Sequence, residues 1–426
     1  KHQFSHNCPV PMFTILFVAF LFADIVTRLW LGWRQIRHVH QHRNEVPAAF
    51  ADRISLRSHQ RAADYTQGKI QIGMVETLVD AAVLIGLTLL GGLQFLDVEL
   101  ARLIEHEMAR QLALIGAVVL VMGVVNLPFS LWRKFRLEAR FGFNRMTPGL
   151  FFSDMIKGLL VTLILGLPLA ALVLWVMGNA GTNWHWWAWG IWVAFNLAIM
   201  WLFPTVIAPL FNKFTPLDNP ELAERIHNLA QRCGFAINGL FVMDGSKRSA
   251  HGNAYFTGFG KSRRIVFFDT LLSKLSGEEI EAVLAHELGH FKFKHIIKRM
   301  ALSFLLALVF FQVLGWLSQQ VWFYTDLGVI PQLGRPNDAL ALILFFLVVP
   351  VFTFWVTPLF SLLSRRDEFQ ADHFAAQQAN PDALVSALVK LYDDNAATLT
   401  PDPVHSAFYD SHPPAAIRIQ KLKYGL

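Results

Sequence analysis

The stretch ALALILFFLVVPVFTFWVTPLFSL, residues 339–362, contains no charged side chain. A helix of this length crosses the hydrocarbon core of a bilayer, which takes about 20 apolar residues. Six further apolar stretches are also long enough, so we expect the chain to cross the membrane seven times. The expected spans are 11–32, 74–96, 112–132, 159–178, 186–208, 300–323 and 339–362. The sequence thus predicts a mostly α-helical, polytopic membrane protein.

The composition of the 426 residues favours the same class of protein. Of these residues 54% are hydrophobic, 13% aromatic and only 16% charged, and the mean hydropathy is +0.40. Such a chain is too apolar to be an ordinary soluble, disordered or fibrous protein. The net charge of +6 does not indicate a nucleic-acid partner, because the basic residues lie between the apolar stretches. The two cysteines, Cys8 and Cys233, cannot form a disulfide scaffold.

The distribution of Lys and Arg predicts the orientation in the membrane. The links after the first and third spans are rich in these residues, whereas the links after the second, fourth and sixth spans hold few. Positively charged links stay in the cytosol, so the odd links and the C-terminal segment are expected there. The first span is too long for a cleavable signal peptide and no small-residue cleavage site follows it. Because the chain opens on Lys1, we expect its natural start to lie upstream.

Two stretches, 209–299 and 363–426, are too polar for lipid and too long to be simple connections. Both are expected on the cytosolic side. The predicted organisation has four parts: transmembrane helices 1–5 at 1–208, an α+β catalytic insertion at 209–299, helices 6 and 7 at 300–362, and a segment at 363–426 that completes the active site.

The insertion at 209–299 mixes helix and strand patterns. Pro220–Phe235 has the periodicity of an amphipathic helix. Residues 239–243 and 264–268 have the composition of short strands, as does the stretch 253–258 between them. We therefore expect a small α+β domain between the fifth and sixth spans.

The chemistry indicated by the sequence centres on His286-Glu287-Leu-Gly-His290. Ser276 and Glu279 have the capping-box spacing of a helix start, and apolar residues continue one helix face through the motif. The two histidines, four apart, then project from the same side, where neutral imidazoles suit one zinc ion. Glu287 can take a proton from water held by that ion. Chance produces such a motif only roughly 0.02 times per chain of this composition; the alternative is a polar helix end at the membrane surface.

A third ligand is expected because zinc hydrolases use three protein ligands and keep a fourth position for water. The segment 364–375 supplies Glu368 and Asp372, four apart on one face of a helix. We assign Glu368 to the metal and Asp372 to the free ring N–H of a ligand histidine, which it orients. Taken alone, the segment would be an exposed charged helix. Its position after a span, on the side of the histidines, favours the ligand role.

Several motifs in the same order resemble those of the type I CAAX prenyl proteases, a family of integral-membrane zinc metalloproteases. The motifs are Phe141-Gly-Phe-Asn144, 207–217, Asn253-Ala-Tyr255, His286-Glu-Leu-Gly-His290, Glu368-Phe-Gln-Ala-Asp372 and Ser411-His-Pro-Pro-Ala-Ala-Ile-Arg418. The resemblance runs from about residue 130 to the C-terminus.

The resemblance implies seven long helices around a large water-filled chamber, with the zinc site facing it near the cytosolic boundary. It also implies that a substrate peptide lies along a strand edge at Asn253, Ala254 and Tyr255. His412 and Arg418 would stabilise the oxyanion and position the site, because donors aimed at the developing charge lower the barrier. The alternatives are a turn residue for His412 and, for Arg418, an ion pair with an acidic residue of the 364–375 segment.

Acidic residues within the spans give a separate hint of a wet interior. Glu76 and Asp80 lie on one helix face, which is costly in hydrocarbon unless they meet water or a cation. The alternative is that the second span starts later and leaves both at the interface. Asp24 and Arg28 are less informative, because they are four apart and can pair with each other.

We therefore expect a zinc endopeptidase that binds one zinc ion and acts on a peptide or protein substrate, prenylated or not, within membrane lipid. The expected location is a bacterial inner membrane with the site facing the cytosol, or an organelle membrane for a eukaryotic source. The alternatives are a quality-control protease for damaged membrane proteins and a transporter or receptor with a structural zinc. An intramembrane-cleaving protease is disfavoured because the motif is followed by Lys292, Lys294, His295, Lys298 and Arg299.

Overall fold

The computed structural model describes residues 11–257, 264–332 and 334–424. Seven helical stretches in these ranges are long and apolar enough to cross a membrane, which confirms the predicted number of spans. Their main helices are α1 (Met12–Gln41), α2 (Leu56–Leu87), α4 (Glu107–Trp132), α5 (Pro148–Asn179), α6 (Trp184–Leu202), α11 (His295–Leu317) and α13 (Asp338–Thr353). The π-helical turn η2 (Arg133–Glu138) continues α4, η3 (Gly181–Asn183) precedes α6, and η4 (Phe203–Ile207) and α7 (Ala208–Phe211) continue it.

Two predicted spans run past the ends of their helices. The second was expected to reach residue 96, but α2 ends at Leu87 and the chain turns at Gly91, whose φ of 77° is one that glycine adopts without steric cost. The apolar residues that follow form a separate helix, α3 (Gly92–Leu103). The sixth was expected to reach residue 323, but α11 ends at Leu317, and the short α12 (Val321–Thr325) follows.

The seventh span continues without a loop into the segment that was expected to carry the third ligand. After α13 the chain passes through the single turn η6 (Phe354–Val356) into α14 (Thr357–Gln378). The predicted domain border at residue 362 therefore falls inside α14. The charged residues that start at Arg365 end the apolar pattern, but the helix continues through them. The elements α13, η6 and α14 therefore connect the seventh span directly to Glu368 and Asp372.

The insertion between the fifth and sixth spans contains a four-stranded sheet. Its strands are β1 (Phe214–Pro216), β2 (Gly239–Met243), β3 (Ala254–Thr257) and β4 (Arg264–Phe268), in the order β1-β2-β4-β3. β2 and β4 pair in parallel, and the other two pairs are antiparallel. β2 and β4 occupy the predicted ranges; β3 starts one residue later than expected, and Gly258 lies outside the described residues. β1 was not predicted, since three residues ending in proline show no alternation.

Helices cover this sheet and bury its apolar face. They are α8 (Pro220–Arg232), α9 (Asp269–Leu272), α10 (Gly277–Lys292) and α15 (Pro381–Asp394). The C-terminal helices α16 (Pro403–Tyr409) and α17 (Ala415–Tyr424) pack against α14 and α15, respectively, and η1 (Ala48–Phe50) and η5 (Gly245–Lys247) are single short turns. Ile226, Phe267, Leu284, Leu288 and Leu388 are almost completely buried in one core that α8, β4, α10 and α15 share. Each such side chain contributes roughly 1.5–3 kcal/mol, so the core holds α10 firmly in place.

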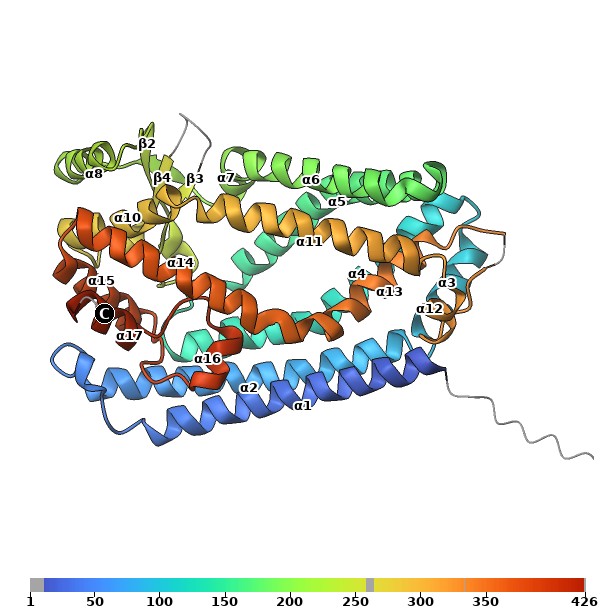
Figure 1. The fold of residues 1–426 in the computed structure, drawn as a ribbon, viewed down its shortest axis with the longest axis horizontal. Coiled ribbons are helices and arrows are strands. Elements are labelled where there is room, and N and C mark those ends of the chain that lie inside the picture. The colour runs from blue at the N-terminus through green and yellow to red at the C-terminus, as the bar shows by residue number, and fades with distance from the viewer. Residues whose placement is uncertain (1–10, 258–263, 333, 425–426) are drawn as a thin grey trace, which may run out of the picture.

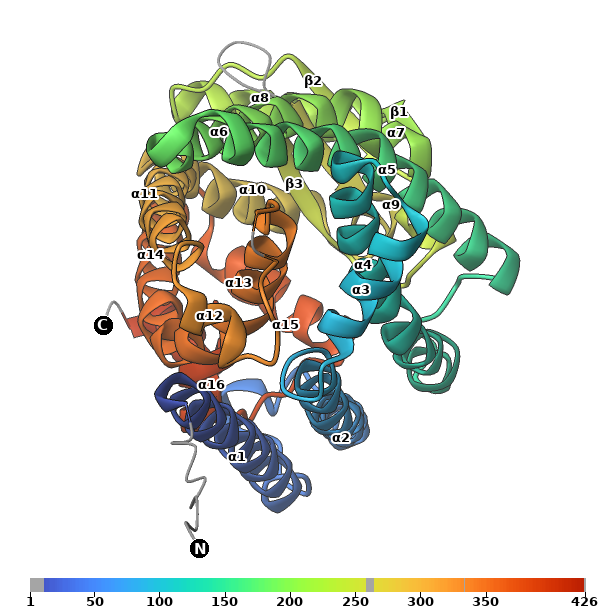
Figure 2. The same ribbon diagram turned by 90° about the vertical axis from the view of Figure 1, so that its right-hand side faces the viewer.

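The catalytic insertion and the C-terminal helices lie together at one end of the molecule. Figure 1 shows α8, α10, α15 and α17 at this end, and α3 and α12 at the other. The link between α1 and α2 is also at the end that carries α10. Seen from the side of α3 and α12, the long helices form a ring (Figure 2).

Cavities lie between the long helices. One of about 310 Å³ is lined by residues of α1, α2, α4 and α13, among them Asp24, Arg28 and Asp80. Another, of about 410 Å³, is almost entirely apolar and lies between α4, α5, α6, α11 and α13. Asp24 pairs with Arg28, as expected, and Glu76 pairs with Arg133, a contact that was not predicted. These two cavities are much smaller than the large water-filled chamber that the resemblance implies, so the chamber stays a prediction.

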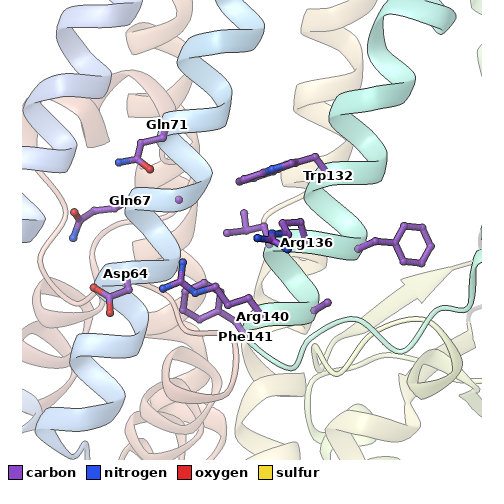
Figure 3. Close-up of a pocket in the computed structure, with 11 residues that line it drawn as sticks. Asp64, Gln67, Gln71, Trp132, Arg136, Arg140 and Phe141 are labelled. Atoms are coloured by element: carbon purple, nitrogen blue, oxygen red, sulfur yellow. The ribbon is translucent and has the colours of Figure 1, made fainter.

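A further cavity of about 800 Å³ lies between α2 and the end of α4. Trp132, Arg136 and Arg140 extend toward α2 (Figure 3), and Asp64, Gln67 and Gln71 of α2 also line this cavity. The predicted metal ligands do not line this cavity, so it is not the site of the expected chemistry.

Candidate metal centre

The helix that carries the motif begins at the predicted capping box. The Ser276 hydroxyl accepts a hydrogen bond from the Glu279 amide, at 3.3 Å, and the Glu279 carboxylate accepts one from the Ser276 amide, at 2.7 Å. The Ser386 hydroxyl and the Lys390 ammonium of α15 also donate to Glu279, at 2.7 and 2.8 Å. The capping box therefore closes the start of α10, and Ser386 and Lys390 connect this helix end to α15.

Three predicted ligands meet where α10 packs against α14. The Nε2 atoms of His286 and His290 are 3.2 Å apart. The Glu368 carboxylate lies 3.3 Å from His286 Nε2 and 3.4 Å from His290 Nε2. These three residues form a group whose ligand atoms could hold one metal ion.

The geometry and charge of this triangle fit a metal ion. Tetrahedral ligands about 2.1 Å from an ion lie about 3.4 Å from one another, close to the three observed edges. Glu368 Oε2 is buried without a hydrogen-bond partner among the described residues, a costly state for a carboxylate unless a cation is bound. Burial opposes a charged His286 ring, but its contacts with Asp372 and Glu368 raise its pKa to about 9. The surroundings therefore favour positive charge.

The second nitrogen of His286 faces a buried ion pair. Its Nδ1 lies 2.8 Å from Asp372 Oδ1. Arg418 donates to both oxygens of Asp372, at 2.8 and 2.6 Å, and its Nη1 lies 3.9 Å from Glu368. All of these side chains are buried, so Arg418 has the geometry of an ion-pair partner rather than of a group open to substrate.

His290 is supported by residues that were not singled out from the sequence as site residues. Its Nδ1 lies 3.0 Å from Nδ1 of His295, the first residue of α11. The Nε2 of His295 lies 3.1 Å from Gln370 Oε1 on α14. His295 entered the sequence argument only as one of several polar residues after the motif, and no fixed spacing relates it to a metal ligand.

Glu287 and His412 lie at the same site and, unlike His286 and Glu368, are not fully buried. Glu287 follows His286 on α10, and its side chain makes no hydrogen bond with the described residues. Burial raises its pKa, although the two neighbouring histidines act in the opposite direction. His412 Nε2 lies 3.5 Å from Glu368 Oε1, and 59% of the His412 side chain is exposed. Both residues are thus placed to contact a bound molecule.

The strand predicted to hold substrate is an edge of the sheet. Within the described residues β3 pairs on one side only, with β4. The Asn253 side chain accepts a hydrogen bond from the Ala254 amide, at 2.8 Å, and Tyr255 packs edge-on against Phe268 of β4. Phe256 contacts Phe291, the residue after His290, with 5.2 Å between the ring centroids. The strand β3, which has one unpaired edge in the described residues, therefore packs through Phe256 against α10.

A helix with a glutamate between two histidines, in a group that could hold a metal ion, joined to seven helices that could cross a membrane, is the arrangement of an integral-membrane metallopeptidase. Comparison with known families agrees with this class. Residues 35–213 match the family model "CAAX prenyl protease N-terminal, five membrane helices", and residues 216–425 match "Peptidase family M48". The chain belongs to the CAAX prenyl protease 1 group of peptidase family M48.

Individual relatives cover most of the chain. A "CAAX prenyl protease 1 homolog" of Oryza sativa is 39% identical over 75% of this chain and 74% of its own. "CAAX prenyl protease 1" of Saccharomyces cerevisiae is 32% identical over 96% and 95%. The crystal structure of S. mikatae Ste24p superposes with a TM-score of 0.89 at 30% identity, over 96% of this chain and 99% of that one. The transmembrane helices and the α+β insertion therefore both have the fold of that crystal structure.

These comparisons change two sequence-based interpretations. The relatives named above are eukaryotic, so the expected bacterial source is not supported. The transporter or receptor alternative is excluded by membership of a peptidase family. The structure also disfavours an intramembrane-cleaving protease, because α10 is not one of the seven helical stretches that could cross a membrane.

Proposed function

We propose that this protein is a zinc-dependent endopeptidase whose active site faces the cytosol. The observation that carries the proposal is the meeting of His286, His290 and Glu368, with ligand atoms 3.2–3.4 Å apart, beside Glu287. A zinc ion held there would polarise a water molecule and the peptide carbonyl. The remaining chemistry belongs to side chains of this chain.

Glu287 is proposed as the general base and then the general acid. Its partly enclosed carboxylate has a raised pKa, which suits a group that accepts a proton from water and returns it to the leaving amine near neutral pH. Among the described residues, no side chain forms a hydrogen bond with the Glu287 carboxylate. The carboxylate can therefore take part in both proton transfers.

His412 and Arg418 are proposed to have different roles. His412 is exposed beside Glu368 and can donate to the oxyanion that develops on the cleaved peptide bond. Arg418 is buried and bound to Asp372, so its role would be to hold Asp372 against His286. Asp372 in turn would fix the orientation of that ring.

The substrate is proposed to bind as an extended peptide along β3. An unpaired strand edge offers main-chain hydrogen bonds to any peptide and so binds without reading much sequence. Asn253, Ala254 and Tyr255 lie at the start of this edge. The names of the relatives suggest a prenylated C-terminal segment as the substrate, and a damaged membrane protein is the other candidate.

The cytosolic orientation is supported by the placement of the basic links. Residues 34–69, around the link between α1 and α2, and residues 133–157, from η2 to the start of α5, are rich in Lys and Arg, and such regions stay in the cytosol. The second of these regions contacts the insertion between the fifth and sixth spans, since Asn144 pairs with Ser249 and Asp154 of α5 binds Arg248. Because the named relatives are eukaryotic, we propose an organelle membrane rather than a bacterial one.

The test compares three substrates on the purified full chain in detergent with zinc added: a farnesylated CAAX peptide, its unprenylated twin and an unfolded membrane protein. Preferential cleavage of the farnesylated peptide would support a prenyl protease, whereas equal cleavage of all three would favour quality control. Cleavage by a Glu287→Gln variant at the wild-type rate, or the absence of bound zinc on metal analysis, would overturn the proposed mechanism.

A further inference from the structure

The metal-binding nitrogen of His290 must carry no hydrogen if it is to bind an ion. A neutral imidazole has one hydrogen, which can sit on either ring nitrogen, and the partner of the distal nitrogen decides which. For His286 the partner is the carboxylate of Asp372, which can only accept. For His290 the partner is another histidine, His295, which can donate or accept. The tautomer of His290 thus depends on what surrounds His295.

His295 is held by two acceptors on α14. Its Nε2 lies 3.1 Å from Gln370 Oε1 and 3.5 Å from a carboxylate oxygen of Asp367. Because a carboxylate cannot donate, the hydrogen of a neutral His295 belongs on Nε2. Its Nδ1 is then an acceptor, and the hydrogen in the 3.0 Å contact between the two Nδ1 atoms must come from His290. That leaves His290 Nε2 bare and directed at His286 and Glu368.

Asp367 is itself held by Arg299 of α11, which donates to its carboxylate at 3.0 Å. The acceptors that face His295 Nε2 are therefore fixed by contacts between α11 and α14. The same arrangement of arginine, carboxylate and histidine occurs at His286 through Arg418 and Asp372.

The backbone is bent to bring His295 to this position. Lys294, between α10 and α11, has a φ of 58°, in the left-handed region that a residue with a side chain adopts only at a cost. The bend places His295, 1% exposed, against His290 with 5.1 Å between the ring centroids. A conformation of this kind is kept where the surrounding contacts require it.

We propose that His295, oriented by Gln370 and Asp367, is a positioning residue that keeps His290 in its metal-binding tautomer. The inference rests on the proposed metal site. It adds the contact that leaves His290 Nε2 without a hydrogen and so able to bind the ion. It predicts that removing the acceptor at position 295 weakens metal binding even though every ligand remains.

The test measures zinc affinity of the metal-free full chain in detergent, by competition with a chelator. His295→Phe keeps a flat ring but removes the acceptor, and we expect the affinity to fall about 10- to 100-fold, as for other residues that orient metal ligands. His295→Asn, whose side-chain oxygen can accept from His290, should recover part of the loss. Gln377→Leu, an exposed change on α14, the helix that carries Gln370, should leave the affinity unchanged.

A cobalt spectrum separates positioning from a general loss of packing. With Co²⁺ in place of zinc, His295→Phe should shift and weaken the visible absorption of the bound ion, which His290→Ala should lose, while Gln377→Leu matches wild type. If His295→Phe does not fold, Gln370→Leu, which leaves His295 in place, should show a smaller change of the same sign. Wild-type zinc affinity in these variants, with loss of binding in His290→Ala, would overturn the positioning role alone. Equal binding by wild type and His290→Ala would overturn the proposed metal site itself.

Discussion

Gly289 lies directly against Ala371, so that a methyl group on Gly289 would come within 3.0 Å of the Ala371 Cα and 3.2 Å of its carbonyl oxygen. The glycine sits one residue before His290, and the alanine one residue before Asp372. The two helices therefore lie in direct contact between His286 and His290 on α10 and between Glu368 and Asp372 on α14. This contact lets the short Glu368 carboxylate reach both imidazoles.

Gly289→Ala is expected to push α14 away from α10. The obstacle is backbone, which cannot rotate aside, so the change should cost about 1–3 kcal/mol of stability and reduce metal affinity together. Thermal unfolding in detergent and zinc competition would measure the two effects. Gly277→Ala on the same helix meets only ordinary contacts, the nearest at 3.6 Å, and should be tolerated. If Gly289→Ala bound zinc as tightly as the Gly277→Ala control, the close approach would not matter for the site.

Local patterns predicted much of this fold. Residues 239–243 and 264–268 form β2 and β4 as expected, because short apolar runs between turn residues suit buried strands. The capping box at Ser276 correctly predicted the start of α10. Both features depend on neighbours in sequence.

The features that were missed depend on contacts between distant parts of the chain. A helix at 364–375 was expected, but its continuity with the seventh span was not. The charges after residue 364 end the apolar signal, whereas α14 runs through them because helical hydrogen bonds do not require lipid. His295 supports His290 only because the chain bends at Lys294 and because α14 brings Gln370 alongside. Neither the bend at Lys294 nor the contact with Gln370 follows from a spacing in the sequence.

Glu287→Gln is expected to lower turnover about 10²- to 10⁴-fold, because the amide cannot accept or deliver a proton. Zinc should remain bound at the wild-type ratio, since Glu287 is not among the three grouped ligands. Peptide cleavage and metal content of the same preparation would be measured. Glu278→Gln, an exposed change at the start of the same helix, serves as the control and should retain activity. Loss of zinc in Glu287→Gln would instead make Glu287 a ligand.

Arg418→Ala is expected to destabilise the protein by about 3–5 kcal/mol, because it leaves Asp372 as a buried charge without its partner. The double variant Arg418→Leu with Asp372→Leu removes both charges and should recover much of this stability, yet still bind zinc more weakly through the loss of support for His286. Thermal unfolding and zinc competition separate the two effects. A double variant as unstable as Arg418→Ala would show that the unpaired charge is not the cause.

Glu279→Gln is expected to lower stability by about 1–2 kcal/mol near neutral pH, since the carboxylate closes the capping box and pairs with Lys390. Burial opposes ionisation of Glu279, but the hydrogen bond from Lys390 and those from Ser276 and Ser386 outweigh it and lower its pKa. A carboxyl whose pKa is lower in the folded state stabilises the fold above its unfolded pKa, about 4.3 for glutamate, and loses that effect as pH falls through the folded value. The difference in unfolding temperature between wild type and Glu279→Gln should therefore be constant from about pH 7 to 5 and shrink below about pH 4. The exposed Glu278→Gln variant should show little difference across the same range, and a Glu279 effect that grew on acidification would contradict the lowered pKa.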